Sequence, residues 1–217
     1  MLVACWSVKG GSGTTVVAAS LAVLFARSSA NGALLVDLAG DAPAALGLSE
    51  STGPGVLAWL AAGSDVGPSA LARLEHDAGG GLAVVPSGER AGPPSPGRVD
   101  ELAVALATDP RAVVVDAGRV PSARADALVG AATVSLLVLR PCYLALRRAV
   151  AAPIRPSGVV LVTEPGRALS RRDVEDVLGV EVKAEIALDP VVARAVDAGL
   201  LAARLPRPLE RSLRHAA

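Results

Sequence analysis

The chain of 217 residues has a formal net charge of zero at pH 7, and 52% of its residues are hydrophobic although only 2% are aromatic. This length suits a single domain with a sizeable core. The balanced charge gives no global indication of nucleic-acid binding, and no apolar run reaches the roughly 18–20 residues that a membrane-spanning helix needs.

Short apolar runs alternate with amphipathic stretches along the whole chain. Continuous apolar runs are typical of strands buried on both faces of a parallel sheet. We predict strands at Leu2–Val8, Ala33–Asp37, Leu82–Pro86, Ala112–Asp116, Val134–Arg140, Gly158–Thr163 and Val182–Ile186. We predict helices at Thr14–Arg27, Gly55–Ala62, Ser69–His76, Arg98–Thr108, Ser122–Gly130, Tyr143–Ala152, Ser170–Leu178 and Val191–Leu200. This alternation over residues 1–217 predicts one α/β domain, a doubly wound and mainly parallel sheet with helices on both faces.

Local signals mark helix ends in the C-terminal part of the chain. Ser170 followed by Asp173 matches a capping box, and Gly179 supplies a stop signal. Asp189 before Pro190 offers an N-cap followed by proline at the first helical position. The tail 205–213 has leucines at every fourth position and two prolines. We expect it to pack as a final helix rather than to hold a membrane.

A glycine-rich turn, Lys9–Gly13, separates the first strand from the first helix. Glycines let successive backbone N–H groups point into one concavity, and a helix N-terminus adds partial positive charge, so this turn can hold phosphate. In the P-loop pattern G-x-x-x-x-G-K-[ST], Gly13 fills the second glycine, Thr14 the lysine and Thr15 the Mg²⁺ ligand. The alternative is a strand–helix turn that binds no ligand.

The run Lys9-Gly10-Gly11-Ser12-Gly13-Thr14-Thr15 resembles the deviant Walker A motif K-G-G-x-G-K-[ST] of the MinD/ParA-type P-loop ATPases. The resemblance implies that Gly10, Gly11, Ser12, Gly13, Thr14 and Thr15 bind the phosphates of ATP or ADP. It also implies that Lys9 reaches the nucleotide of a partner subunit and couples binding to a face-to-face homodimer. Because Thr14 carries no charge, we expect weaker nucleotide binding and impaired hydrolysis.

Two further strand ends resemble acidic motifs of the same family. Asp37 matches the first acid of V-D-x-D, whereas Ala39 stands at the second; Asp41 lies two residues later and is the candidate substitute. The alternative for Asp37 is a carboxylate that caps the next turn. Asp116 ends a Walker B-like strand and, with Thr15, is the candidate Mg²⁺ ligand. In this family the segment called switch II usually begins D-x-P-x-G. Here residues 116–119 read Asp-Ala-Gly-Arg, so switch II is altered. The candidate catalytic residues are Lys9, Asp37 and Asp41.

The end of the chain resembles the adenine-binding segments of this family. Thr163 stands where an asparagine usually reads the base, and Leu188 and Pro190 fall in the segment that packs against the adenine ring. Ordinary strand-end chemistry explains these residues equally well. Residues 55–60 and 82–88 resemble stretches of the TadZ/CpaE-like proteins that localise Tad-type pili.

These resemblances imply a cytoplasmic, homodimeric ATP/ADP- and Mg²⁺-binding positioning or assembly factor that hydrolyses ATP slowly or not at all. Its partners would be proteins of a localisation or secretion system, at a polar or membrane-associated assembly, with any membrane contact indirect. The alternative is an active ParA-like partition ATPase that binds DNA nonspecifically through C-terminal arginines. The two cysteines, Cys5 and Cys142, are expected to be thiols in a cytosolic protein.

Overall fold

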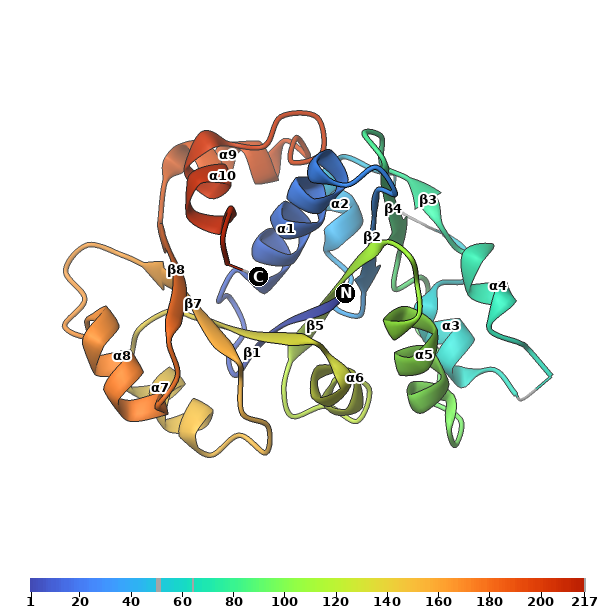
Figure 1. Ribbon diagram of the computed structural model, residues 1–217, viewed down its shortest axis with the longest axis horizontal. Helices are drawn as coiled ribbons and strands as arrows, with labels where there is room; N and C mark the ends of the chain where they lie inside the picture. Colours follow the sequence, from blue (N-terminus) through green and yellow to red (C-terminus); the bar gives the residue numbers. More distant parts are fainter. Residues whose placement is uncertain (50–51, 64, 217) are drawn as a thin grey trace.

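The computed structural model describes residues 1–49, 52–63 and 65–216. These residues form one eight-stranded sheet with helices on both faces (Figure 1), which confirms the predicted α/β class. No described helix is long and apolar enough to cross a bilayer.

The sheet is parallel except at one edge. Its strands are β1 (Leu2–Ser7), β2 (Ala33–Asp37), β3 (His76–Asp77), β4 (Leu82–Val85), β5 (Ala112–Arg119), β6 (Val134–Leu139), β7 (Gly158–Thr163) and β8 (Val182–Ala187). Their order is β3-β4-β2-β5-β1-β6-β7-β8, and only β3 pairs antiparallel, with β4. The chain moves from β1 towards one edge through β2 and towards the other through β6. Open α/β sheets bind ligands at the carboxyl ends of the strands where the order reverses, which here is the end of β1.

Two apolar cores lie on opposite faces of this sheet. The helices are α1 (Thr14–Ser28), α2 (Ala42–Leu46), α3 (Val56–Ala61), α4 (Ser69–Ala72), α5 (Arg98–Ala107), α6 (Ala125–Ala131), α7 (Tyr143–Val150), α8 (Arg171–Leu178), α9 (Pro190–Asp197) and α10 (Arg207–Leu213). The helices α1, α2, α9 and α10 cover one face, and α3 to α8 cover the other (Figure 1). Within β1, Leu2 and Trp6 join one core while Val3 and Cys5 join the other. Strands buried on both faces are therefore apolar throughout.

The predicted helix caps are confirmed. Ser170 and Asp173 form a capping box, Gly179 ends α8 in the left-handed conformation, and Asp189 accepts a hydrogen bond from the Val191 amide. The tail forms α10, whose Leu209 and Leu213 are buried against α1 and β8. The expectation that the tail packs as a helix is thus confirmed.

Several elements differ from the sequence prediction. Helix α6 begins at Ala125 rather than Ser122, and α9 ends at Asp197 rather than Leu200. Helix α4 ends at Ala72, and His76, predicted at its end, instead begins the edge strand β3. Helix α2 was not predicted, because five residues give too short a pattern. Strand β5 continues three residues beyond Asp116, to Arg119, because Gly118 and Arg119 remain paired with β1 around a bulge at Ala117.

Candidate functional site

The glycine-rich turn joins β1 to α1, and its backbone N–H groups donate no hydrogen bond to any described residue. Gly11 and Gly13 adopt left-handed conformations, with φ of 74° and 88°, and Gly13 is the N-cap of α1. The first amide of this helix that bonds to a described residue is that of Val17, which donates to the Gly13 carbonyl at 3.0 Å. The Ser12 hydroxyl donates to the Lys9 carbonyl at 2.8 Å and steadies the loop. A row of free amides at a helix N-terminus attracts an anion.

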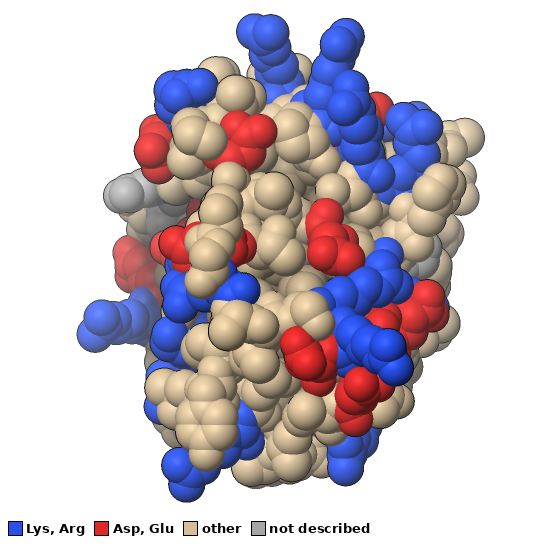
Figure 2. All heavy atoms as spheres, turned by 90° about the vertical axis from the view of Figure 1, so that its left-hand side faces the viewer, with Lys and Arg blue, Asp and Glu red and all other residues tan. Residues whose placement is uncertain are grey.

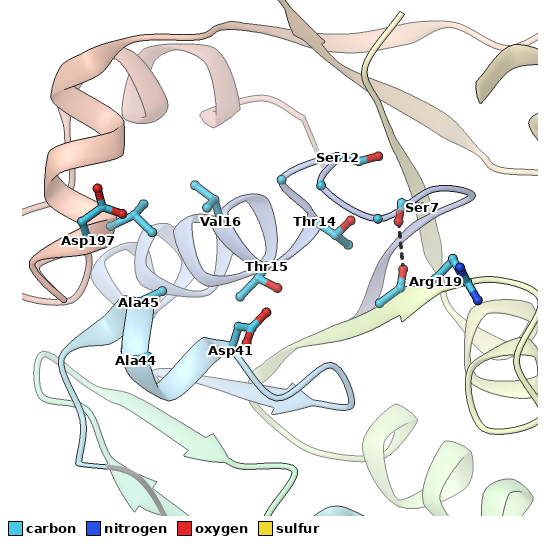
Figure 3. A pocket seen from close by; sticks show the side chains of 15 residues that line it. Ser7, Ser12, Thr14, Thr15, Val16, Asp41, Ala44, Ala45, Arg119 and Asp197 are labelled. Carbon is cyan, nitrogen blue, oxygen red and sulfur yellow. Dashed lines mark hydrogen bonds between the residues drawn. The ribbon is translucent and has the colours of Figure 1, made fainter. Parts of the chain in front are cut away.

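A cavity of about 560 Å³ opens over this loop (Figure 3). It is lined by Ser7, Gly10, Gly11, Ser12, Gly13, Thr14, Thr15, Val16, Asp41, Ala44, Ala45, Gly118, Arg119, Val196 and Asp197. The six loop residues predicted to bind phosphate therefore line one space, together with Asp41. Among these lining residues Arg119 is the only cation, whereas Asp41 and Asp197 are acids.

Asp116 ends the apolar part of β5 and lies beside Thr15, which lines this cavity, although Asp116 itself does not line it. Its side chain is fully buried, and one oxygen accepts a hydrogen bond from the Gly118 amide at 3.1 Å. The other oxygen, Oδ2, has no hydrogen-bond partner among the described residues. Burial raises the pKa of Asp116 from 3.8 to about 6, the nearby Thr15 hydroxyl lowers this pKa, and the charge of Asp37 raises it further. A buried carboxylate oxygen without a partner, close to a threonine hydroxyl, fits the water-rich coordination of Mg²⁺.

Asp37 is opposite Asp116 in the β2–β5 register but has a different environment. One of its oxygens accepts hydrogen bonds from the Ala39 and Gly40 amides, both at 2.8 Å, and the other accepts one from Ala42 at 3.2 Å. Burial raises the pKa of Asp37, although these three amides lower it. Its carboxylate holds the turn into α2 and does not line the cavity, so the geometry favours the capping interpretation.

A second, mainly apolar cavity of about 180 Å³ adjoins the first. The two cavities share Gly13, Val16, Val196 and Asp197. Leu188 lines the second cavity as expected, beside Val192 of α9, but Thr163 and Pro190 do not line it. The Thr163 hydroxyl is 3.4 Å from the Ile186 carbonyl, to which it donates a hydrogen bond, and Pro190 begins α9. An apolar cavity of this kind suits a flat base, with Leu188 as one of its contacts.

Lys9 faces a different space. It is exposed and lines a cavity of about 150 Å³ together with Arg140 and Arg167. Both arginines form ion pairs with Glu164, at 3.0 and 2.6 Å. Lys9 therefore does not line the 560 Å³ cavity, although the two cavities share Gly10, Gly11 and Ser12.

The residues after Asp116 are held against β1 rather than forming a free loop. Gly118 and Arg119 pair with Trp6 and Ser7, and Ala117 is the extra residue of a β-bulge. The Ser7 hydroxyl donates to the Gly118 carbonyl at 3.3 Å. The Val120 amide donates to the Ser7 carbonyl at 2.8 Å. This pairing brings Arg119 beside the phosphate loop, which sequence spacing does not reveal.

Sequence comparison identifies no relative, since neither a protein-family model nor a curated protein matches the chain. Comparison of structures does find similar proteins. A ParA family ATPase from Chlorobium tepidum TLS has a TM-score of 0.80 at 18% identity, over 98% of this chain and 95% of that one. MinD complexed with Mg-ADP from Pyrococcus horikoshii has a TM-score of 0.77 at 20% identity, over 99% and 92%. A variant of McdA from Cyanothece in complex with ATP has a TM-score of 0.70 at 19% identity, over 97% and 93%. The chain thus has the fold of MinD/ParA-type P-loop ATPases.

Proposed function

We propose that this chain is a MinD/ParA-like nucleotide-binding protein whose ATP hydrolysis is slow or absent. In this proposal it acts as a homodimeric positioning or assembly factor. One observation carries the proposal: free loop amides line one cavity, the half-unpaired Asp116 lies beside Thr15 of that cavity, and the uncharged Thr14 occupies the lysine position. The site therefore retains what holds a nucleotide and lacks what drives its hydrolysis.

The described residues divide the binding of ATP or ADP among three groups. The amides of residues 10–16 would hold the phosphates, Thr15 and Asp116 would hold Mg²⁺, and the apolar cavity that includes Leu188 would take the base. When bound, the metal ion supplies positive charge to the phosphates. Solved structures of MinD and McdA with Mg-ADP and ATP support this assignment by similarity of fold.

Slow hydrolysis follows from three changes at the positions that act on the reacting phosphate: Thr14 brings no charge, Ala39 brings no carboxylate, and the switch II turn is paired to β1. The retained acid, Asp37, is engaged by three backbone amides. Loss of one positioned charge at a transition state costs about 3–4 kcal/mol, or roughly a thousandfold in rate. Asp41 lines the cavity and is the remaining candidate to position water.

The homodimer is proposed from Lys9, which is exposed and does not line its own phosphate cavity. The partners are proposed to be proteins of a localisation system, with the TadZ/CpaE branch of pilus assembly as the specific proposal. The chain also shares its fold with MinD from Aquifex aeolicus in a complex with MinC, at a TM-score of 0.69 and 18% identity, over 91% and 85% of the two chains. Partner binding by a protein of this fold supports the same role here.

Calorimetric titration with Mg-ADP and Mg-ATP, combined with a phosphate-release assay, tests nucleotide binding and turnover. We expect saturable binding with phosphate release at background level, and release that rises in Thr14→Lys. Absence of saturable binding at millimolar nucleotide would overturn the proposal. Release that is well above background in the unmodified chain and is abolished by Asp116→Ala would show an active ATPase instead.

The dimer is tested with the two lysines of the chain. Sedimentation with Mg-ATP should show a dimer that is weakened in Lys9→Ala and preserved in Lys183→Ala. Lys183 serves as the control because it lies on β8 and forms an ion pair with Glu181. Equal behaviour of the two variants contradicts the role of Lys9.

A second candidate function, nonspecific DNA binding, rests on the basic surface of the C-terminal helices. Figure 2 shows lysine and arginine side chains along the upper edge of this side of the molecule, where α9 and α10 lie, and mixed charges below. Exposed arginines in this region are Arg194, Arg204, Arg207, Arg211 and Arg214. Gel retardation of duplex DNA that weakens steeply with added salt, and is lost in Arg207→Ala/Arg211→Ala, would favour this function.

A further inference from the structure

The cavity over the phosphate loop presents an imbalance of charge. Asp41 and Asp197 line it, and the buried Asp37 and Asp116 lie close enough that the charges of Asp37 and Asp41 both raise the pKa of Asp116. A bound nucleoside diphosphate such as ADP would add further negative charge to this space. In P-loops a lysine next to the last glycine offsets that charge, but Thr14 occupies this position.

Other cations near the loop do not line this space. Lys9, Arg140 and Arg167 line the 150 Å³ cavity, which shares Gly10, Gly11 and Ser12 with the larger one. Both arginines pair with Glu164, and Arg140 also donates to the Gly11 carbonyl at 3.5 Å. Among the residues lining the larger cavity, Arg119 is the only positive charge.

Arg119 is also available for a ligand. Its side chain is exposed and forms no ion pair or hydrogen bond with any described residue. Its backbone, by contrast, is fixed, because Arg119 pairs with Ser7 and the next amide donates to the Ser7 carbonyl at 2.8 Å. Figure 3 shows Arg119 at the end of β5, beside Ser7, with its side chain turned away from Thr14 and Thr15. A fixed backbone with a free guanidinium is well suited to bind phosphate oxygens bidentately.

We propose that Arg119 supplies the positive charge for the nucleotide's phosphates in place of the Walker A lysine. The β-bulge at Ala117 makes this possible, since it keeps β5 paired with β1 for two residues beyond Asp116. In this proposal, the positive charge missing at Thr14 is supplied by Arg119 of the altered switch II segment. This inference rests on the proposed nucleotide binding and specifies which side chain provides it.

The test is a set of calorimetric titrations with Mg-ADP at low salt on folded variants. Arg119→Gln should weaken binding about tenfold or more, the effect of losing one charge-assisted contact. Arg119→Lys should recover much of the affinity. The matched control is Arg148→Gln: Arg148 lines the neighbouring cavity of about 390 Å³ with Arg119 but does not line the phosphate cavity. It should change affinity less than about twofold, the scale of a screened surface charge.

A double-mutant cycle with Thr14 separates replacement of the lysine from a general effect of charge. In the Thr14→Lys background, Arg119→Gln should cost less than about threefold, because the lysine then supplies the charge. A full tenfold loss in that background, or equal losses in Arg119→Gln and Arg148→Gln, overturns the inference. If the unmodified chain binds Mg-ADP and Arg119→Gln binds it equally well, this inference fails while the proposed function stands. If the unmodified chain binds no Mg-ADP at all, both fail.

Discussion

Asp37 and Asp116 end neighbouring strands, face each other in the sheet register and are both fully buried. Each terminates an apolar run, so the sequence presents them as equivalent. The structure uses them differently: three backbone amides satisfy Asp37, whereas Asp116 keeps one oxygen without a partner among the described residues. A buried carboxylate whose hydrogen bonds are complete fixes a turn, while an incomplete one carries a desolvation cost that a cation can offset. The hydrogen-bond count of a strand-end aspartate therefore indicates its function better than its position does.

The largest expected effect is the loss of the Asp37 carboxylate. Asp37→Ala leaves the amides of Ala39, Gly40 and Ala42 without their acceptor, which we expect to lower the free energy of unfolding by about 3 kcal/mol. Urea denaturation at pH 7.5 without nucleotide measures the change. Asp41→Ala is the control, because Asp41 is exposed on the same turn and its side chain caps nothing. A loss below about 0.5 kcal/mol in Asp37→Ala would remove the distinction between the two strand ends.

The opposite sign is expected at Asp116. Asp116→Asn preserves the shape of the side chain and removes a charge whose pKa is raised to about 6 by burial. Each pH unit between this pKa and the ordinary value corresponds to about 1.4 kcal/mol, so the variant should be more stable by about 1–3 kcal/mol at pH 7.5 without nucleotide. The same variant should lose the Mg²⁺-dependent rise in melting temperature that Mg-ADP gives the unmodified chain. A variant that is less stable and still responds to Mg-ADP would refute the metal-holding role of Asp116.

The difference in free energy of unfolding between the unmodified chain and Asp116→Asn should depend on pH. A carboxyl with a raised pKa binds its proton more tightly in the folded chain than in the unfolded chain. Its contribution is therefore fully favourable below pH 3.8, declines as the pH rises towards about 6 and is constant above that. Unfolding of the unmodified chain and of Asp116→Asn, measured from pH 4 to pH 7.5, should diverge as the pH rises. The raised pKa of Asp37 largely cancels in this comparison, because both proteins retain Asp37. A constant difference across this range would contradict a buried, titrating Asp116.

Much of the fold could be predicted from sequence, for a physical reason. Strands buried on both faces are continuous apolar runs, and capping residues such as Ser170 have side chains that complete a helix end locally. The edge strand β3 could not be predicted, because its two residues are exposed and polar. The first residue of helix α2, Ala42, donates its amide to the Asp37 carboxylate. A hydrogen bond between a side chain and a backbone amide leaves no periodic pattern in the sequence.

The candidate site divides in the same way. The phosphate loop, Thr15 and Asp116 could be predicted because the backbone chemistry of a P-loop requires a fixed local spacing. Asp197 was missed, because it reaches the cavity only where α9 returns to the first helix. Arg119 was missed as a candidate because its position depends on a bulge between β1 and β5. Spacing also predicted that Thr163 and Pro190 contact the base, but neither residue lines the two cavities that share Gly13.

The smallest expected effect concerns the point where the two strand ends meet. The Gly118 amide donates a hydrogen bond to Asp116, and the Ala39 amide donates one to Asp37. Gly118 has a φ of 64°, and an alanine at this position would place its Cβ 3.4 Å from the Cβ of Ala39. Since 3.4 Å is an ordinary contact distance, Gly118→Ala should cost only the backbone strain of an alanine in the left-handed region, about 1 kcal/mol. Gly166→Ala is the matched control, because Gly166 has a φ of 81° and its added Cβ would meet no atom within 4 Å. Urea denaturation should give similar losses for the two variants. A loss at Gly118 larger by about 2 kcal/mol would mean that the two turns are packed as one rigid unit, so that a change at either aspartate is transmitted to the other.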